Sequence, residues 1–248
     1  MNVKNIIIMI LLIFLIYSVY IYFIKASQSS IVKIQDASQK TTIPNNKLLA
    51  GSTDNYTYSS WIYISDYDYN YGHNKSIIYR KTKGHHGINT NKMGGSPYVF
   101  LNKTLNNLTV AIDVMKPNRK IESRLCSIKN IPLQTWVNVI VTLDTRSLDV
   151  YVNGKLRKTC VFNHIPAGYS LTSGLTVCGN DPNDSNSKNG FRGNIGNIEF
   201  LPDKVSPIQA YNIYRRGMSE ISSNMSLDYQ IKGVLLKNHK QIGSVTLG

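Results

Sequence analysis

Apolar residues between Trp136 and Lys155 recur at every second position, which is the period of a β-strand and not of a helix. One face of the first predicted strand, residues 136–143, is wholly aliphatic: Val137, Val139, Val141 and Leu143. Turn residues follow at 144–147, and the alternation resumes at 148–152. Asn153-Gly154 is then a strong hairpin signal, because both central residues of a type I′ turn need a positive φ. The pattern predicts three consecutive antiparallel strands.

The C-terminal segment, residues 218–248, shows a second alternating pattern. Apolar positions alternate over 229–236 and again over 241–247, with polar residues between the two runs. We expect a hairpin that adds two strands to the edge of the main sheet structure. A disordered tail is the alternative.

Four motifs in a fixed order make the chain resemble the concanavalin A-like (laminin G-like) jelly-roll superfamily. They are a Trp-centred strand at Tyr56–Ile64, the meander Trp136–Lys155, the Phe-x-Gly strand Gly190–Phe200 and a short helical segment at Ser206–Gly217. The resemblance covers residues 51–217, a length that suits one sandwich and not two. It implies an all-β fold: an antiparallel jelly-roll β-sandwich with one short helix.

A narrower resemblance is to membrane-anchored members of this superfamily encoded by large DNA viruses of algae and protists. The segments that carry it are Cys126–Trp136, Lys155–Cys160 and the apolar N-terminus. The matching viral sequences have cysteines at both places, so the resemblance implies a Cys126–Cys160 disulfide. Two reduced thiols in the core are the alternative, and Cys178 has no evident partner.

The N-terminus predicts a membrane anchor. Residues 6–24 contain no charged side chain and would form a helix of about 28 Å, close to the hydrocarbon thickness of a bilayer. A cleaved signal peptide is the alternative, although the apolar run is long for one. We therefore divide the chain into a transmembrane signal-anchor at 1–25, a polar linker at 26–50, the sandwich at 51–217 and the C-terminal hairpin at 218–248. This predicts a single-pass membrane protein that binds the bilayer through residues 6–24.

The net charge of +14 reflects a shortage of acidic residues, with 28 Lys and Arg against 14 Asp and Glu. A basic domain attracts anionic partners, such as acidic glycans or phospholipid headgroups. Compositional drift in a Lys- and Asn-rich sequence explains the charge equally well. The sequence has no glycine-rich phosphate loop and no recognition-helix pattern, so we predict no specific nucleic-acid partner.

Catalytic carboxylates are not evident in the sequence. Retaining glycoside hydrolysis needs two carboxylates about 5–5.5 Å apart, and glucanases of the resembled superfamily carry them in a Glu-x-Asp-x-x-Glu strand motif. That motif is absent, and Glu122, Glu199 and Glu220 stand singly. The sequence therefore predicts a protein that is not an enzyme.

Ligand-binding residues are predicted in two loops. In the first, Tyr67, Tyr69 and Tyr71 alternate with Asp66 and Asp68. Tyrosine rings stack on sugars and add contact area with little entropy loss, although alternating tyrosines on a strand more often pack across it. In the second, Asp181 and Asp184 offer carboxylates to Ca²⁺, which needs six to eight oxygens; Asp-Pro-Asn is also a turn former. We predict no other cofactor.

These features together predict a membrane-anchored binding or adhesion module on a virion or host membrane, which recognises carbohydrate or protein through the rim loops of its sandwich. A structural protein between membrane and capsid, without sugar binding, is the first alternative. An unusual glycoside hydrolase is the second.

Overall fold

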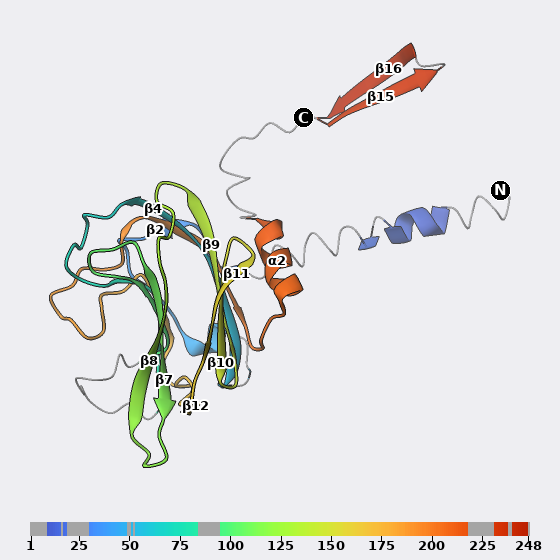
Figure 1. The fold of residues 1–248 in the computed structure, drawn as a ribbon. Coiled ribbons are helices and arrows are strands. Elements are labelled where there is room, and N and C mark those ends of the chain that lie inside the picture. Colours follow the sequence, from blue (N-terminus) through green and yellow to red (C-terminus); the bar gives the residue numbers. More distant parts are fainter. Residues whose placement is uncertain are drawn as a thin grey trace.

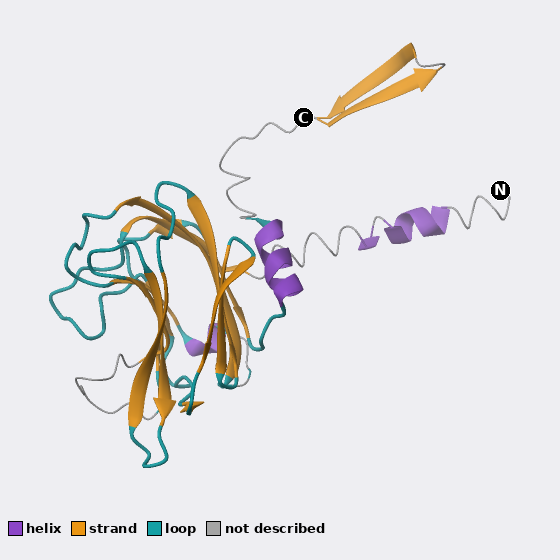
Figure 2. Ribbon diagram, viewed as in Figure 1, coloured by secondary structure: helices purple, strands orange, loops and turns teal. Residues whose placement is uncertain are grey.

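The structure is a computed structural model that describes residues 9–15, 17–18, 30–48, 51, 53–83, 95–217, 231–237 and 240–247. Its main body is a sandwich of two antiparallel sheets, each of seven strands (Figures 1 and 2). The predicted all-β class and two-sheet sandwich are thereby confirmed.

The first sheet, called sheet A here, contains the meander predicted from the sequence. Its strand order is β1 (Ser30–Val32), β14 (Arg192–Leu201), β4 (Asn55–Asp66), β9 (Trp136–Asp144), β10 (Ser147–Val152) and β11 (Lys155–Val161), with β2 (Gln35–Asp36) also paired to β14. Asn153 and Gly154 join β10 to β11 with φ angles of 51° and 71°. The two positive values confirm the predicted turn.

The second sheet, sheet B, faces sheet A across the core. Its strand order is β12 (Ile165–Pro166), β7 (Leu108–Met115), β6 (Gly95–Leu101), β5 (Lys75–Lys81), β13 (Leu175–Val177) and β3 (Thr41–Ile43), with β8 (Ile121–Ile128) paired to β7. The inner faces of both sheets are mainly aliphatic. From sheet A they contribute Val137, Val139, Val141 and Leu143, and from sheet B Leu108, Val110, Ile112 and Val114, all buried in one cluster.

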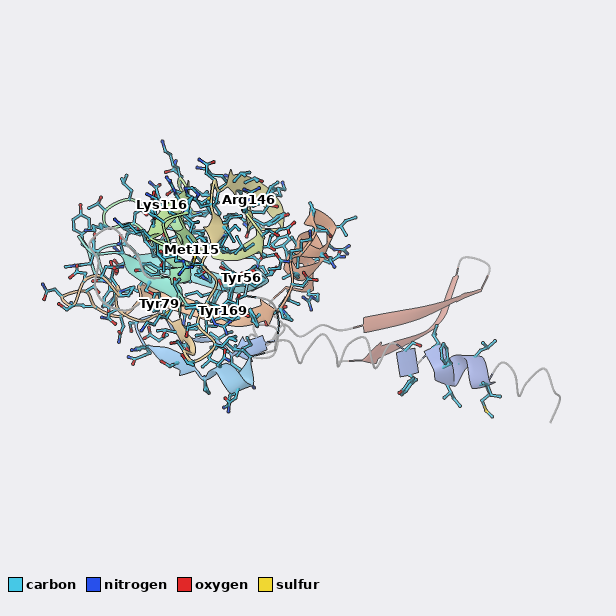
Figure 3. All side chains as sticks on the ribbon, turned by 90° about the horizontal axis from the view of Figure 1, so that it is seen from below. Tyr56, Tyr79, Met115, Lys116, Arg146 and Tyr169 are labelled. Carbon is cyan, nitrogen blue, oxygen red and sulfur yellow. A yellow bond between two sulfur atoms is a disulfide. The ribbon has the colours of Figure 1, made fainter. Side chains whose placement is uncertain are left out.

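One arginine is buried in this core among aromatic rings. Arg80 is 1% exposed, its Nη1 donates to the Tyr58 hydroxyl at 2.8 Å, and its guanidinium lies 3.4 Å from the ring centroid of Tyr169. Tyr169 in turn packs edge-on against Tyr56 at 5.6 Å between centroids; Figure 3 labels both. Burial raises the pKa of Tyr58 above its usual range, so the phenol that Arg80 contacts stays neutral. Aromatic faces stabilise the cation here.

A disulfide joins the two sheets at one edge of the sandwich. Cys126 of β8 and Cys160 of β11 are bonded, with their Cα atoms 6.0 Å apart. This is the pair that the narrower resemblance implied. Cys178 is buried and free, and burial raises the pKa of its thiol.

Helix α2 (Pro207–Arg216) covers the outer face of sheet A (Figure 1). It begins at a capping box, in which Ser206 and Gln209 each accept a hydrogen bond from the other's backbone N–H. Ala210 and Ile213 of the helix pack on Ile140 and Tyr151 of the sheet. Figure 2 shows no helix among the described residues over the outer face of β7 and β8.

The interpretation of residues 26–50 as a linker is wrong from Ser30 onward. β1 and β2 pair with β14, and β3 pairs with β13, so this segment contributes strands to both sheets. The backbone of Ala37 also lies so close to Gly190 that a Cβ there would be 2.0 Å from its carbonyl oxygen. These strands are only two or three residues long, which is too short for an apolar alternation to be detected in the sequence.

The predicted C-terminal hairpin forms, but as a sheet of its own. β15 (Ile231–Lys237) and β16 (Lys240–Leu247) pair with each other and with no strand of the sandwich among the described residues. The structure does not show the predicted extension of the sandwich edge among the described residues.

The predicted membrane anchor falls largely outside the described residues. Residues 9–15, 17 and 18 are helical. Within the described part of the chain, no helix has both the length and the apolar character needed to cross a bilayer.

Candidate functional site

The two loops singled out in the sequence lie against each other at one end of the sandwich. The loop 67–74 joins β4 to β5, and the loop 178–191 joins β13 to β14. Asn70 connects them, because its Nδ2 donates to the Lys188 carbonyl and its Oδ1 accepts from the Lys188 N–H, both at 3.0 Å. His73 Nδ1 is a further 2.6 Å contact, to Asp184 Oδ2. Together the loops form one rim.

Asp66, the last residue of β4, and Asp68 of the first loop differ in role. Asp66 Oδ1 accepts hydrogen bonds from the N–H groups of Asp68 at 2.6 Å and Tyr69 at 3.3 Å, so this carboxylate shapes the turn. Its Oδ2 is 3.5 Å from Arg192 Nε in an exposed ion pair. Asp68 is exposed to solvent. Of the two, Asp68 is the more accessible to a ligand.

The three tyrosines do not act as one surface. Tyr67 donates its hydroxyl to the Asn102 carbonyl at 2.7 Å, so its ring holds the loop in place. Tyr69 lines a cleft of about 320 Å³ together with Arg192 and Asp36. Tyr71 is 60% exposed. The structure therefore divides the predicted cluster into one structural and two accessible rings.

The two predicted calcium ligands are occupied by protein hydrogen bonds. Asp181 is buried, and its two oxygens accept from Asn74 Nδ2 at 2.8 Å and the Asn183 N–H at 3.0 Å. The hydrogen bond from His73 lowers the pKa of Asp184. Within the described ranges, no three His, Cys, Asp or Glu residues gather where they could hold a metal ion. The geometry brings no calcium site together at this rim.

Lys75, which the sequence did not single out, fixes the arrangement of the rim. Its side chain is fully buried, and its Nζ donates to the Asn70 carbonyl at 3.2 Å and the Lys103 carbonyl at 3.3 Å. The same Nζ lies 4.3 Å from the ring centroid of Tyr67. Burial lowers the pKa of Lys75 to about 8. One buried cation thus holds two loops and an aromatic ring together.

A groove of about 330 Å³ opens beside this rim, on the outer face of sheet B. Its floor is a cross-strand row in which Phe100 of β6 pairs with Thr109 of β7, and Thr109 with Ser127 of β8. The other lining residues are Asn74, Asn102, Lys103, Thr104, Leu105 and Leu125. Leu105 and Leu125 are 60% and 57% exposed.

The lining of the groove combines hydrogen-bonding and apolar groups. The hydroxyls of Thr109 and Ser127 are 2.9 Å apart, and Thr109 donates to Asn102 Oδ1 at 2.7 Å. Hydroxyl, amide and ammonium groups thus lie beside two exposed leucines, whereas no lining residue carries a carboxylate. Sequence reasoning missed this site, because its residues come from five separate segments. One feature of the sequence could have indicated it. Thr109, Leu125 and Ser127 occupy outward-facing positions on strands whose other face is buried in the core.

This architecture, a two-sheet jelly roll with a polar groove at one rim, defines a lectin-like class of fold. Residues 35–209 match the family model described as the concanavalin A-like lectin/glucanases superfamily. The chain belongs to that superfamily. Among curated proteins, none matches it.

Solved structures share the fold at low sequence identity. One is the ligand binding domain of botulinum neurotoxin serotype D in complex with N-acetylneuraminic acid: TM-score 0.51, 14% identity, 77% of this chain and 44% of that one. Another is the receptor binding domain of botulinum neurotoxin C/D mosaic serotype: TM-score 0.50, 15% identity, 77% of this chain and 44% of that one. This chain thus spans less than half the length of either. At such identity the likeness concerns the fold alone.

Proposed function

We propose that this protein is a non-catalytic binding module that recognises carbohydrate in the groove between β6, β7, β8 and the rim loops. The observation that carries the proposal is the lining of that groove: hydroxyl, amide and ammonium groups beside the exposed side chains of Leu105 and Leu125, and no carboxylate. Sugars present the matching mixture of hydroxyl groups and apolar C–H faces. Hydrolysis would need two carboxylates.

A fold-level analogy supports the same proposal. The serotype D neurotoxin domain, which has this fold, is in complex with N-acetylneuraminic acid. Fold similarity does not carry function by itself, so the groove residues of this chain are what must be tested. Tyr71 and Asp68, both exposed on the adjacent loop, extend the proposed contact surface. We do not include Ca²⁺ in the proposal.

We propose further that residues 6–24 anchor the module in a bilayer as a single-pass helix, on a virion or host membrane. The support is the uncharged apolar run itself and the narrower resemblance to virus-encoded, membrane-anchored members of the superfamily. Extraction of the full chain from membranes by detergent but not by alkaline carbonate is the expected behaviour. Release by carbonate alone would contradict the anchor.

The groove is tested with the full chain in detergent on a glycan array, followed by titration of the best ligand. Leu125→Ala removes an exposed apolar contact and should weaken binding about tenfold, the equivalent of about 1.4 kcal/mol. Leu171→Ala is the matched control, because Leu171 is 59% exposed on a loop and does not line the groove.

Equal affinities of the two variants would place the ligand elsewhere. If the array shows no selective binding at all, the structural role between membrane and capsid takes the place of this proposal.

A further inference from the structure

A second pocket lies away from the rim, where the β10–β11 hairpin meets helix α2. It has a volume of about 470 Å³, larger than the groove. The residues used below are Asn130, Asn153, Lys155, Arg157, Tyr211 and Tyr214, all of which line it. They come from the segment after β8, from the hairpin and from the helix.

The aromatic side of this pocket is held in place by packing. Tyr214 stacks on Trp61 of sheet A at 5.7 Å between ring centroids, with the ring planes 21° apart. The helix lies so close to the hairpin turn that a Cβ on Gly154 would be 2.9 Å from the Tyr214 ring. Tyr211, one turn earlier, is 46% exposed. The pocket therefore has one fixed ring and one accessible ring.

The hairpin side of the pocket is cationic. Lys155 and Arg157 are exposed on β11, and neither makes an ion pair with any described carboxylate. No lining residue is acidic. Arg215 lies nearby, 6.0 Å from the ring of Tyr211. Several cations without counter-ions around a concave site produce a positive local potential that attracts anions.

We propose that this pocket binds the sulfate or carboxylate group of an acidic saccharide. Arg157 offers the planar donor pair that matches such groups, and Lys155 adds a second charge. The exposed ring of Tyr211 provides a face on which the sugar stacks, and the amides of Asn130 and Asn153 offer polar partners at the edge. The site is separate from the groove, so this proposal does not rest on the proposed function.

The test is calorimetric titration of the full chain in detergent with a sulfated tetrasaccharide, its desulfated counterpart and sodium sulfate. The sulfated sugar should bind at least tenfold more tightly than either of the others, because it alone engages both the cations and the ring. Tyr211→Ala should weaken the sulfated sugar severalfold and leave the weak binding of sodium sulfate unchanged.

The double variant Lys155→Gln/Arg157→Gln should weaken binding of the sulfated tetrasaccharide at least tenfold. Lys47→Gln/Lys120→Gln is the matched control, since both lysines are exposed elsewhere and the net charge changes by the same amount. The control should remain within twofold of the unmodified chain. Equal losses in both double variants would show unspecific attraction to polyanions and overturn the proposal. So would equal affinity for the sulfated and desulfated sugars.

Discussion

The two outer faces of the sandwich differ in whether another element covers them. On sheet A, Ile140 and Tyr151 are buried beneath α2, so a face with apolar residues is withdrawn from water. On sheet B, the row Phe100, Thr109 and Ser127 forms the floor of an open groove, with Leu125 beside it. The covered face contributes to stability, because burial of apolar area is favourable. The open face keeps polar groups and exposed leucines where a ligand can reach them.

This difference shows why function cannot be located from hydrophobicity alone. Both faces have aromatic residues on their outward positions, Trp61 and Tyr151 on one and Tyr79 and Tyr98 on the other. Helix α2, which begins at the Ser206 capping box, covers the first set, Trp61 and Tyr151, and buries it. The second set packs with Phe100 in a small buried cluster, and Phe100 in turn lines the accessible groove. Mutations that affect one face and spare the other test this distinction.

The largest effect is expected from the disulfide, because it joins the two sheets. Replacing Cys126 and Cys160 with alanine removes a cross-link across 34 residues. In the chain-entropy model the free energy of unfolding should fall by about 4 kcal/mol. Urea denaturation monitored by tryptophan fluorescence measures it. Loss of stability without loss of sugar selectivity would show that both faces persist, whereas an unchanged midpoint would contradict a formed disulfide.

The second-largest effect is expected from a substitution on the face of sheet A that α2 covers. Ile140→Ala leaves a cavity between sheet A and α2, and should lower the free energy of unfolding by about 3 kcal/mol. Binding in the groove on the other sheet should not change. Denaturation and glycan titration of the same sample give both numbers. A change in groove affinity would mean that the two faces are coupled through the core.

A smaller, pH-dependent effect is expected on the open face. Lys75 has a pKa of about 8 in the folded protein against its ordinary 10.5, so between these values the unfolded chain holds more protons. Stability from this residue therefore rises as the pH increases from 8 to 10.5, and is lowest below 8, where the buried amine is charged. In Lys75→Met this rise should disappear. Thermal midpoints of both proteins from pH 7 to 10 give the difference.

The Lys75→Met variant also sharpens the comparison of faces. It loses the hydrogen bonds to the Asn70 carbonyl of the rim and to the Lys103 carbonyl of the β6–β7 connection, which lines the groove. Affinity in the groove should therefore fall. Parallel pH profiles for the variant and the unmodified protein would disprove the role of Lys75.

The smallest effect is expected at the contact between His73 and Asp184, whose side chains are 34% and 29% exposed. The hydrogen bond from His73 lowers the pKa of Asp184, so its contribution is present above the ordinary carboxyl pKa and is lost as the pH falls through the folded value. Asp184→Asn should therefore change the thermal midpoint slightly at pH 7 and not at all in strong acid. Added Ca²⁺ should shift neither protein.

The fold was largely predictable from particular residues. The aliphatic face of β9 and the Asn153-Gly154 turn predict the meander correctly, because alternation is clear where one face of a strand is fully buried. β1, β2 and β3 were missed because they are only two or three residues long, and Gln35, Thr41 and Thr42 among them are polar. Their pairing depends on β13 and β14, which lie far away in sequence.

The candidate site was predictable only in part. The sequence indicated the two loops, since Tyr, Asp, Asn and Gly mark turns and contacts, but not that Asn70 joins them. It gave equal weight to Tyr67, Tyr69 and Tyr71, whereas the hydroxyl partner of Tyr67 makes that ring structural. Lys75 lies in a run that reads as an ordinary strand. Its role depends on carbonyl groups contributed by two other segments.

If residues 6–24 anchor the chain as proposed above, the pairing of β1 with β14 limits how far the sandwich can move from the membrane. A free linker of residues 26–50 would let the domain range over several tens of ångströms. With Ser30 already part of sheet A, five residues at 25–29 separate the proposed anchor from the fold, and five extended residues reach about 18 Å at most. The leash is short. On such a tether the domain would sample a narrow layer above the lipid surface, so neighbouring copies would present their sites at nearly the same height, a geometry that favours multivalent capture of a ligand-coated surface.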